Sequence, residues 1–128
     1  MTNEQRMQCA GIITSKASNA AEQLVRSGAA LAQRETSYVA EMLQVLKPIA
    51  DITLDQNAEN ALCSSVLSTV RNTQKSAYMK ATKISHVPLF GKMCKQSFYD
   101  IFEALGWEVA NQLYLLKMRE GAAATSDC

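Results

Sequence analysis

The sequence lacks acidic side chains over a long central interval. Glu59 is the last acid before it and Asp100 is the first acid after it, so residues 60–99 contain no Asp or Glu. This acid-free block carries six basic residues: Arg71, Lys75, Lys80, Lys83, Lys92 and Lys95. Since the whole chain has a formal net charge of only +1, its two flanks are acidic. Clustered positive charge attracts a polyanion, and the block therefore indicates an anionic partner.

The residues that most enzymes and metal sites require are also scarce. A single histidine, His86, excludes every motif with two histidine ligands. The five glycines are scattered, which excludes a glycine-rich phosphate loop. The four cysteines are Cys9, Cys63, Cys94 and Cys128. They lie far apart and form no C-x-x-C pair, so the sequence suggests neither a zinc site nor a disulfide framework. We therefore expect a non-enzymatic protein with no metal and no cofactor.

Long apolar runs are missing as well. No stretch approaches the roughly 20 consecutive apolar residues of a membrane-spanning helix, and the apolar patch near the N-terminus is too short for a signal peptide. We expect no membrane association and a cytoplasmic location. Only five Gly and two Pro interrupt 128 residues rich in Ala, Leu, Gln, Glu, Lys and Met, a composition that favours helices. We predict one all-α domain over residues 1–120 and a disordered tail at 121–128.

Apolar residues at alternating spacings of three and four predict a first helix of about 30 residues, which would be about 45 Å long. Residues 1–12 are expected to be loosely ordered or to form a frayed helix start, and the helix proper would be capped at Ser15 or Ser18 and run to Lys47. Glu35 interrupts its apolar stripe and marks an edge or a crossing point. A helix of this length is expected to pack along another long helix, either in the same chain or in a second copy. The predicted dimer or partner interface consists of Leu24, Leu31, Tyr38 and Met42.

A second helix is predicted to start at a capping box over residues 53–56, or at Asp55 alone, and to continue to about Ser85. Residues 86–91 contain Pro88 and Gly91 and predict the next break. A third helical region spans residues 92–119, and Gly106 could bend or split it. The predicted fold is all-α: two long antiparallel helices plus a shorter C-terminal bent helix or helical hairpin, assembled as a dimeric helical bundle.

The second helix has a distinctive polar face opposite its apolar stripe. That face contains small polar side chains, most of them hydroxyls, and long cations: Asn60, Ser64, Ser68, Arg71, Lys75 and Thr82. Small residues allow a backbone to approach closely, and Arg and Lys then reach flanking phosphates. The same pattern is compatible with an ordinary solvated helix face. Because the face lies within the acid-free block, we interpret it as a candidate nucleic-acid surface.

The order of elements resembles one family, the nodavirus B2-type suppressors of RNA silencing, which are small all-helical proteins. The resemblance lies in two long helices and a shorter third, a proline-containing break after the second helix, and a basic line along that helix. It is carried by residues 61–63 and 75–82, then Pro88 and Gly91, and covers about a quarter of the chain. The family's dimers lay their long helices along an A-form duplex and contact phosphates and 2′-hydroxyls without reading sequence. The resemblance implies central phosphate contacts at Arg71 and Lys75, with outer contacts at Ser64, Ser68 and Lys83.

Two hypotheses follow from the sequence. The first is a cytoplasmic homodimer that binds double-stranded RNA through the second helix and suppresses RNA silencing. This agrees with the physics of duplex RNA. Its major groove is so deep and narrow that side chains cannot read the bases there, and shape and backbone contacts therefore dominate recognition. The alternative is a helical adaptor, chaperone or assembly protein that binds another protein through its long apolar helix.

Overall fold

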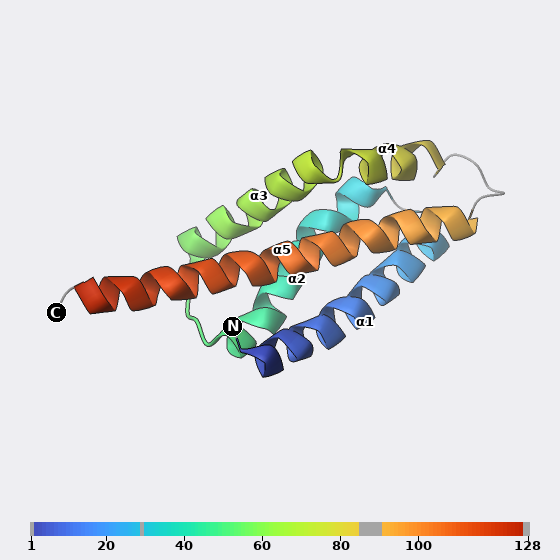
Figure 1. Cartoon of the computed structure of the whole chain (residues 1–128). Coiled ribbons are helices and arrows are strands. Elements are labelled where there is room, and N and C mark those ends of the chain that lie inside the picture. Colours follow the sequence, from blue (N-terminus) through green and yellow to red (C-terminus); the bar gives the residue numbers. More distant parts are fainter. Residues whose placement is uncertain (1, 29, 85–90, 127–128) are drawn as a thin grey trace.

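The computed structural model describes residues 2–28, 30–84 and 91–126, with side chains for all of these except 80–84, 91–94 and 121–126. Every regular element in these ranges is an α-helix, which confirms the predicted all-α class. The helices are α1 (Asn3–Ser27), α2 (Leu31–Ala50), α3 (Gln56–Thr73), α4 (Lys75–Ile84) and α5 (Gly91–Ser126) (Figure 1). The predicted proline break at 86–91 falls largely on residues 85–90, which lie outside the described residues.

The first long helix of the prediction is in fact two helices, because the chain turns at Gly28. Gly28 has a left-handed backbone (φ 66°), and its N–H donates to the carbonyl oxygen of Leu24 (3.1 Å), which ends α1. A residue without a Cβ adopts this conformation at little steric cost. The prediction of one uninterrupted helix to Lys47 is therefore wrong, and α1 and α2 pack against each other.

At the N-terminus, the second of the two predictions for residues 1–12 is the closer one: residues 3–12 are helical, but this helix start is capped rather than frayed. Thr2 and Gln5 form a reciprocal capping box: the Thr2 hydroxyl accepts from the Gln5 N–H (3.1 Å), and the Gln5 side chain accepts from the Thr2 N–H (2.9 Å). Gln5 also donates to the carbonyl oxygen of Ile49 in the last turn of α2 (3.0 Å). This start of α1 is thus fixed by both local and tertiary hydrogen bonds.

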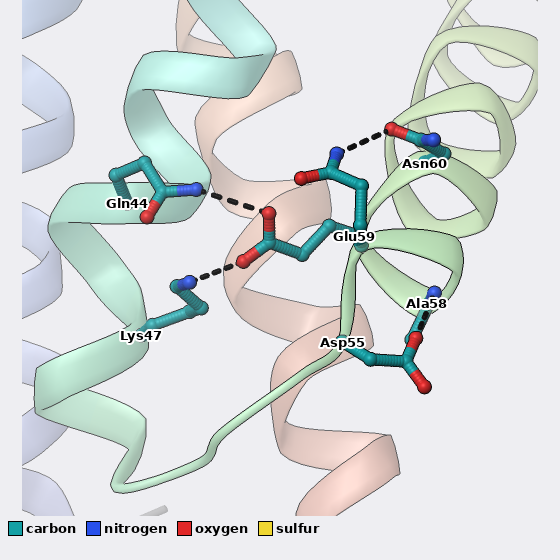
Figure 2. A network of polar contacts seen from close by, with 7 residues as sticks. Gln44, Lys47, Asp55, Ala58, Glu59 and Asn60 are labelled. Atoms are coloured by element: carbon teal, nitrogen blue, oxygen red, sulfur yellow. Dashed lines mark hydrogen bonds and ion pairs between the residues drawn. The ribbon is translucent and has the colours of Figure 1, made fainter.

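The connection from α2 to α3 is defined at both ends. Pro48 lies inside the last turn of α2, and the helix ends at Asp51, which adopts a left-handed backbone (φ 54°). Asp55 caps α3 by accepting from the N–H of Ala58 (2.7 Å), which confirms the second of the two predicted caps. Figure 2 shows this cap beside a second contact, in which Lys47 of α2 pairs with Glu59 of α3.

The predicted second helix is interrupted at Gln74. Gln74 leaves the helical conformation (φ −112°, ψ 36°), yet its N–H still donates to the carbonyl oxygen of Val70 (2.8 Å). Its own carbonyl oxygen accepts from the N–H of Tyr78 in α4 (3.1 Å). Because hydrogen bonds continue on both sides, α3 and α4 are separated by a kink rather than by a loop.

Helix α5 is the element on which the others pack. It contacts all four other helices and crosses the whole bundle in Figure 1. The prediction of a shorter C-terminal element, either a bent helix or a helical hairpin, is wrong, since α5 continues through Gly106 as one helix and is the longest of the five described helices. Its backbone extends to Ser126, whereas the side chains of 121–128 lie outside the described part. The predicted disordered tail therefore stays a prediction.

Gly106 explains how α5 comes so close to α1. A Cβ at this position would lie 2.9 Å from Cγ2 and 3.1 Å from Cγ1 of Ile13, closer than side-chain atoms pack. Nearby, the rings of Tyr38 and Phe102 contact each other at a centroid distance of 4.7 Å. The hydrophobic core therefore lies between α5 and the two helices α1 and α2. The largest fully buried side chains of the core include Phe102, Ile13, Leu24, Met42 and Leu43.

Candidate nucleic-acid interface

The fold collects the acid-free block at one side of the bundle. Helix α4 packs on α5 and continues from α3, so most of residues 60–99 belongs to neighbouring elements (Figure 1). The flanking acids lie on the same helices at the two edges of the block: Glu59 is in the first turn of α3, and Asp100 is in the third turn of α5. The backbone thus places the block on α3, α4 and the start of α5, and the basic side chains of the block that the structure describes are those of Arg71, Lys75 and Lys95.

Three of the five predicted contact residues meet in one shallow depression on α3. It is lined by Ser64, Leu67, Ser68, Arg71 and Asn72. Ser64, Ser68 and Asn72 are exposed, and half of the Arg71 side chain is exposed. The lining therefore offers hydroxyl, amide and guanidinium groups, which are the groups that bind phosphate and ribose oxygens.

Arg71 is not a free cation, because it pairs with a buried carboxylate. Its Nη2 donates to Oε1 of Glu35 in α2, and the Glu35 side chain is only 3% exposed. The hydroxyl of Tyr78 in α4 donates to the other carboxylate oxygen, Oε2 (2.7 Å). Glu35 thus holds one residue on each side of the kink at Gln74.

The charges of this trio depend on one another. The hydrogen bond to Glu35 raises the pKa of Arg71 above its ordinary value, since it favours the protonated guanidinium. Burial, followed by the hydrogen bond to Glu35, raises the pKa of Tyr78, so its hydroxyl stays protonated and remains a donor. Arg71 keeps further N–H donors on its exposed half. It can therefore serve the fold and still face a ligand.

Lys75 and Lys83 are placed differently from Arg71. Lys75 is exposed at the first position of α4, and no hydrogen bond or ion pair of its ammonium occurs among the described residues. Lys83 belongs to the last turns of α4, and its side chain lies outside the described residues. Lys95 is exposed in the second turn of α5, on the helix that packs against α4. Among the predicted contact residues, Lys75 is consequently the cation whose described side chain is exposed and has no partner among the described residues.

The N-terminal end of α3 is anchored away from this surface. Glu59 accepts from Nζ of Lys47 and from the side-chain amide of Gln44 (3.3 Å), both from α2 (Figure 2). The hydrogen bond from Lys47 lowers the pKa of Glu59 below its ordinary value, since it stabilises the carboxylate. The last acid before the acid-free block is therefore neutralised by α2 and turned away from the exposed serines.

Sequence reasoning identified Glu35 as an interruption of an apolar stripe but did not find its partners. An acid at a core position of a helix requires a cation or a hydrogen-bond donor beside it. The acid within the apolar stripe therefore indicated that Glu35 has such a partner, but not which residue it is. Arg71 and Tyr78 lie 36 and 43 residues further along the chain. Their spacing of seven residues places them on one helical face only if the helix is nearly continuous across Gln74, so the kink had to be known first.

The residues predicted for a dimer or partner interface lie inside the chain's own bundle. Leu24, Tyr38 and Met42 are each at most 5% exposed, and Leu31 is partly buried against the same core. The prediction left open whether the long helices pair within or between chains. These side chains pack within one chain.

The described residues contain neither a metal-binding cluster nor a membrane-spanning helix. No group of three or more His, Cys, Asp and Glu side chains within the described ranges is arranged to hold a metal ion. No helix there combines the length and apolarity that crossing a membrane would require. Compared with known proteins, the chain matches no family model, no curated protein and no solved structure.

Proposed function

We propose that this chain is a non-enzymatic, duplex-RNA-binding protein that works as a homodimer in the cytoplasm. The single observation that carries the proposal is the position of the acid-free block: residues 60–99 carry six basic residues and no acid, they span most of α3, all of α4 and the start of α5, and α4 contacts both α3 and α5. A phosphate backbone is the partner that such a surface attracts most strongly. Suppression of RNA silencing, as the resemblance implies, would follow from covering the duplex.

The depression on α3 supports RNA as the polyanion. Ser64 and Ser68 expose hydroxyls next to the guanidinium of Arg71. A 2′-hydroxyl can both donate and accept hydrogen bonds, and a serine hydroxyl complements it in either role. Cations one or two helical turns away then have phosphates within reach. Contacts of this kind recognise the backbone and shape of an A-form duplex without reading its sequence.

The test uses Lys75, since reversing its charge is compatible with folding. An acid in the first turn of α4 interacts favourably with the helix dipole, so Lys75→Glu is expected to leave stability within about 0.5 kcal/mol of wild type. Arg6→Glu in the first turn of α1 makes a charge change of the same size, at an exposed site outside the acid-free block, and is the matched control.

Binding is measured by fluorescence anisotropy with a labelled 21-base-pair RNA duplex at several salt concentrations, starting from low salt. Lys75→Glu should weaken binding by about tenfold or more and reduce the salt slope by about one, while Arg6→Glu should bind nearly as wild type does. Equal effects of the two variants would mean that only net charge matters, and the interface assigned to α3 and α4 would be wrong.

The alternative is a helical adaptor that binds another protein. The residues first assigned to it, such as Met42, are core residues, so such a partner would have to use other apolar side chains. Exposed apolar residues do occur on α5, and their arrangement favours a specific occupant, a second copy of this chain.

A further inference from the structure

A groove runs between α3 and α5 on the surface of the bundle. Its volume is about 510 Å³ and most of its lining is apolar. The groove is lined by Ala58, Ala61, Leu62, Ser65, Glu108, Gln112, Leu115, Leu116 and Arg119. We call it the α3–α5 groove. The three α3 residues other than Leu62 are small, which allows the backbone of an incoming helix to approach closely.

The α5 side of the groove has the spacing of a helix-packing seam. Glu108, Gln112, Leu115 and Arg119 follow one another at intervals of four, three and four residues, the repeat by which one helix packs along another. Leu115 is 43% exposed, and Met118 on the next turn is 54% exposed. In Figure 1 the last turns of α5, beyond the groove, extend past the ends of the other helices. Leu115 and Met118 are therefore left uncovered by the other described helices.

The charges at the two ends of the seam are complementary to each other. Glu108 and Arg119 lie eleven residues apart, which corresponds to about 16 Å along the helix. Neither forms an ion pair with another described residue, and Glu108 only accepts a hydrogen bond from Gln112 (3.0 Å). When a second α5 lies across the first in the opposite direction, each Glu108 meets the Arg119 of the other copy. This is the self-complementary pattern of a two-fold interface.

We propose that the α3–α5 groove is the dimer interface, occupied by α5 of a second copy running in the opposite direction. Leu115 from each copy meets near the two-fold axis, between the two Glu108–Arg119 pairs. The small side chains of α3 line the floor on which the partner helix rests. The inference builds on the homodimer of the proposed function, but it does not depend on RNA binding.

The interface is tested by sedimentation velocity of the full chain from about 1 to 200 µM. Wild type is expected to dimerise in this range, because a seam of a few turns is at the small end of specific interfaces. Leu115→Glu should be monomeric throughout. Met7→Glu places the same acid on α1 at a side chain that is 75% exposed, and it should dimerise as wild type does. Circular dichroism of each variant confirms that the helices are intact.

A charge swap decides the orientation. Glu108→Arg and Arg119→Glu each bring like charges together twice in the dimer, so each should weaken it by about tenfold or more. The double variant restores both opposite-charge pairs and should dimerise within about threefold of wild type. A wild-type chain that is monomeric at 200 µM overturns both the dimer and the interface. A dimer that is unaffected by Leu115→Glu, or a double variant without rescue, overturns the interface alone. Anisotropy with duplex RNA reports separately on the proposed function.

Discussion

Replacing Arg71 by alanine should destabilise the fold, although half of the arginine side chain is exposed. Glu35 is almost completely buried and has two hydrogen-bond donors in this structure, Arg71 and Tyr78. Without Arg71 the carboxylate keeps only Tyr78 and loses its counter-charge. Removing one partner of a fully buried ion pair costs about 3–5 kcal/mol. The exposed half of Arg71 admits water to the site, so we expect a smaller loss of about 1–3 kcal/mol.

Urea unfolding followed by circular dichroism measures this loss by linear extrapolation. Lys75→Ala is the matched control, since Lys75 is an exposed cation four residues further on with no partner among the described residues, and it should change stability by about 0.5 kcal/mol or less. Combining Arg71→Ala with Glu35→Gln removes the buried charge, and the two changes should couple by about 1 kcal/mol or more. If Arg71→Ala proves as mild as Lys75→Ala, Glu35 does not depend on Arg71, and the trio across the kink does not hold α3 and α4 in place.

Two further predictions concern the core and the connection between α2 and α3. Gly106→Ala should lower the unfolding free energy by about 1 kcal/mol, because overpacking against Ile13 outweighs the gain in helix propensity. Gly11→Ala, where a Cβ meets open space, should raise the unfolding free energy by about 0.5–1 kcal/mol. Equal effects of the two variants in urea unfolding would contradict the close contact of α1 and α5. The pKa of Glu59 is lower in the folded chain than in the unfolded one, so this group contributes stability above the unfolded pKa of about 4.3, and that stability is lost as the pH falls through the folded value. Glu59→Gln should therefore lessen the loss of stability on acidification. If the variant leaves the acid side of the stability-versus-pH profile unchanged, the pair with Lys47 contributes nothing to stability.

Periodicity and composition were sufficient to predict the all-α class, since few glycines and prolines interrupt the helical spacing. They could not locate the turn at Gly28, because a glycine is tolerated inside a helix and the apolar stripe continues on both sides of it. The stripe itself was correctly identified, as Leu24 and Met42 are core residues. What a stripe cannot reveal is its partner, and here that partner is α5 of the same chain. The capping box of Thr2 and Gln5 is a local pattern and can be read from the sequence.

The candidate site was predicted in part. An exposed face with Ser64, Ser68 and Lys75 followed correctly from helical spacing, since these positions lie opposite the apolar stripe. The second role of Arg71 could not be inferred, because its partner Glu35 is distant in sequence and meets it only after α2 and α3 have packed. The face was therefore predictable, but the division of its cations into structural and free ones required the fold.

The central claim is that the acid-free block binds the backbone of duplex RNA. The most direct measurement is a titration of the wild-type chain with a labelled 21-base-pair RNA duplex at several salt concentrations, beside duplex DNA and single-stranded RNA. We expect duplex RNA to bind most tightly, and log K to fall linearly with log salt, by about 0.9 for each phosphate contacted. An absence of binding to duplex RNA at low salt, where attraction to phosphates is strongest, would contradict it.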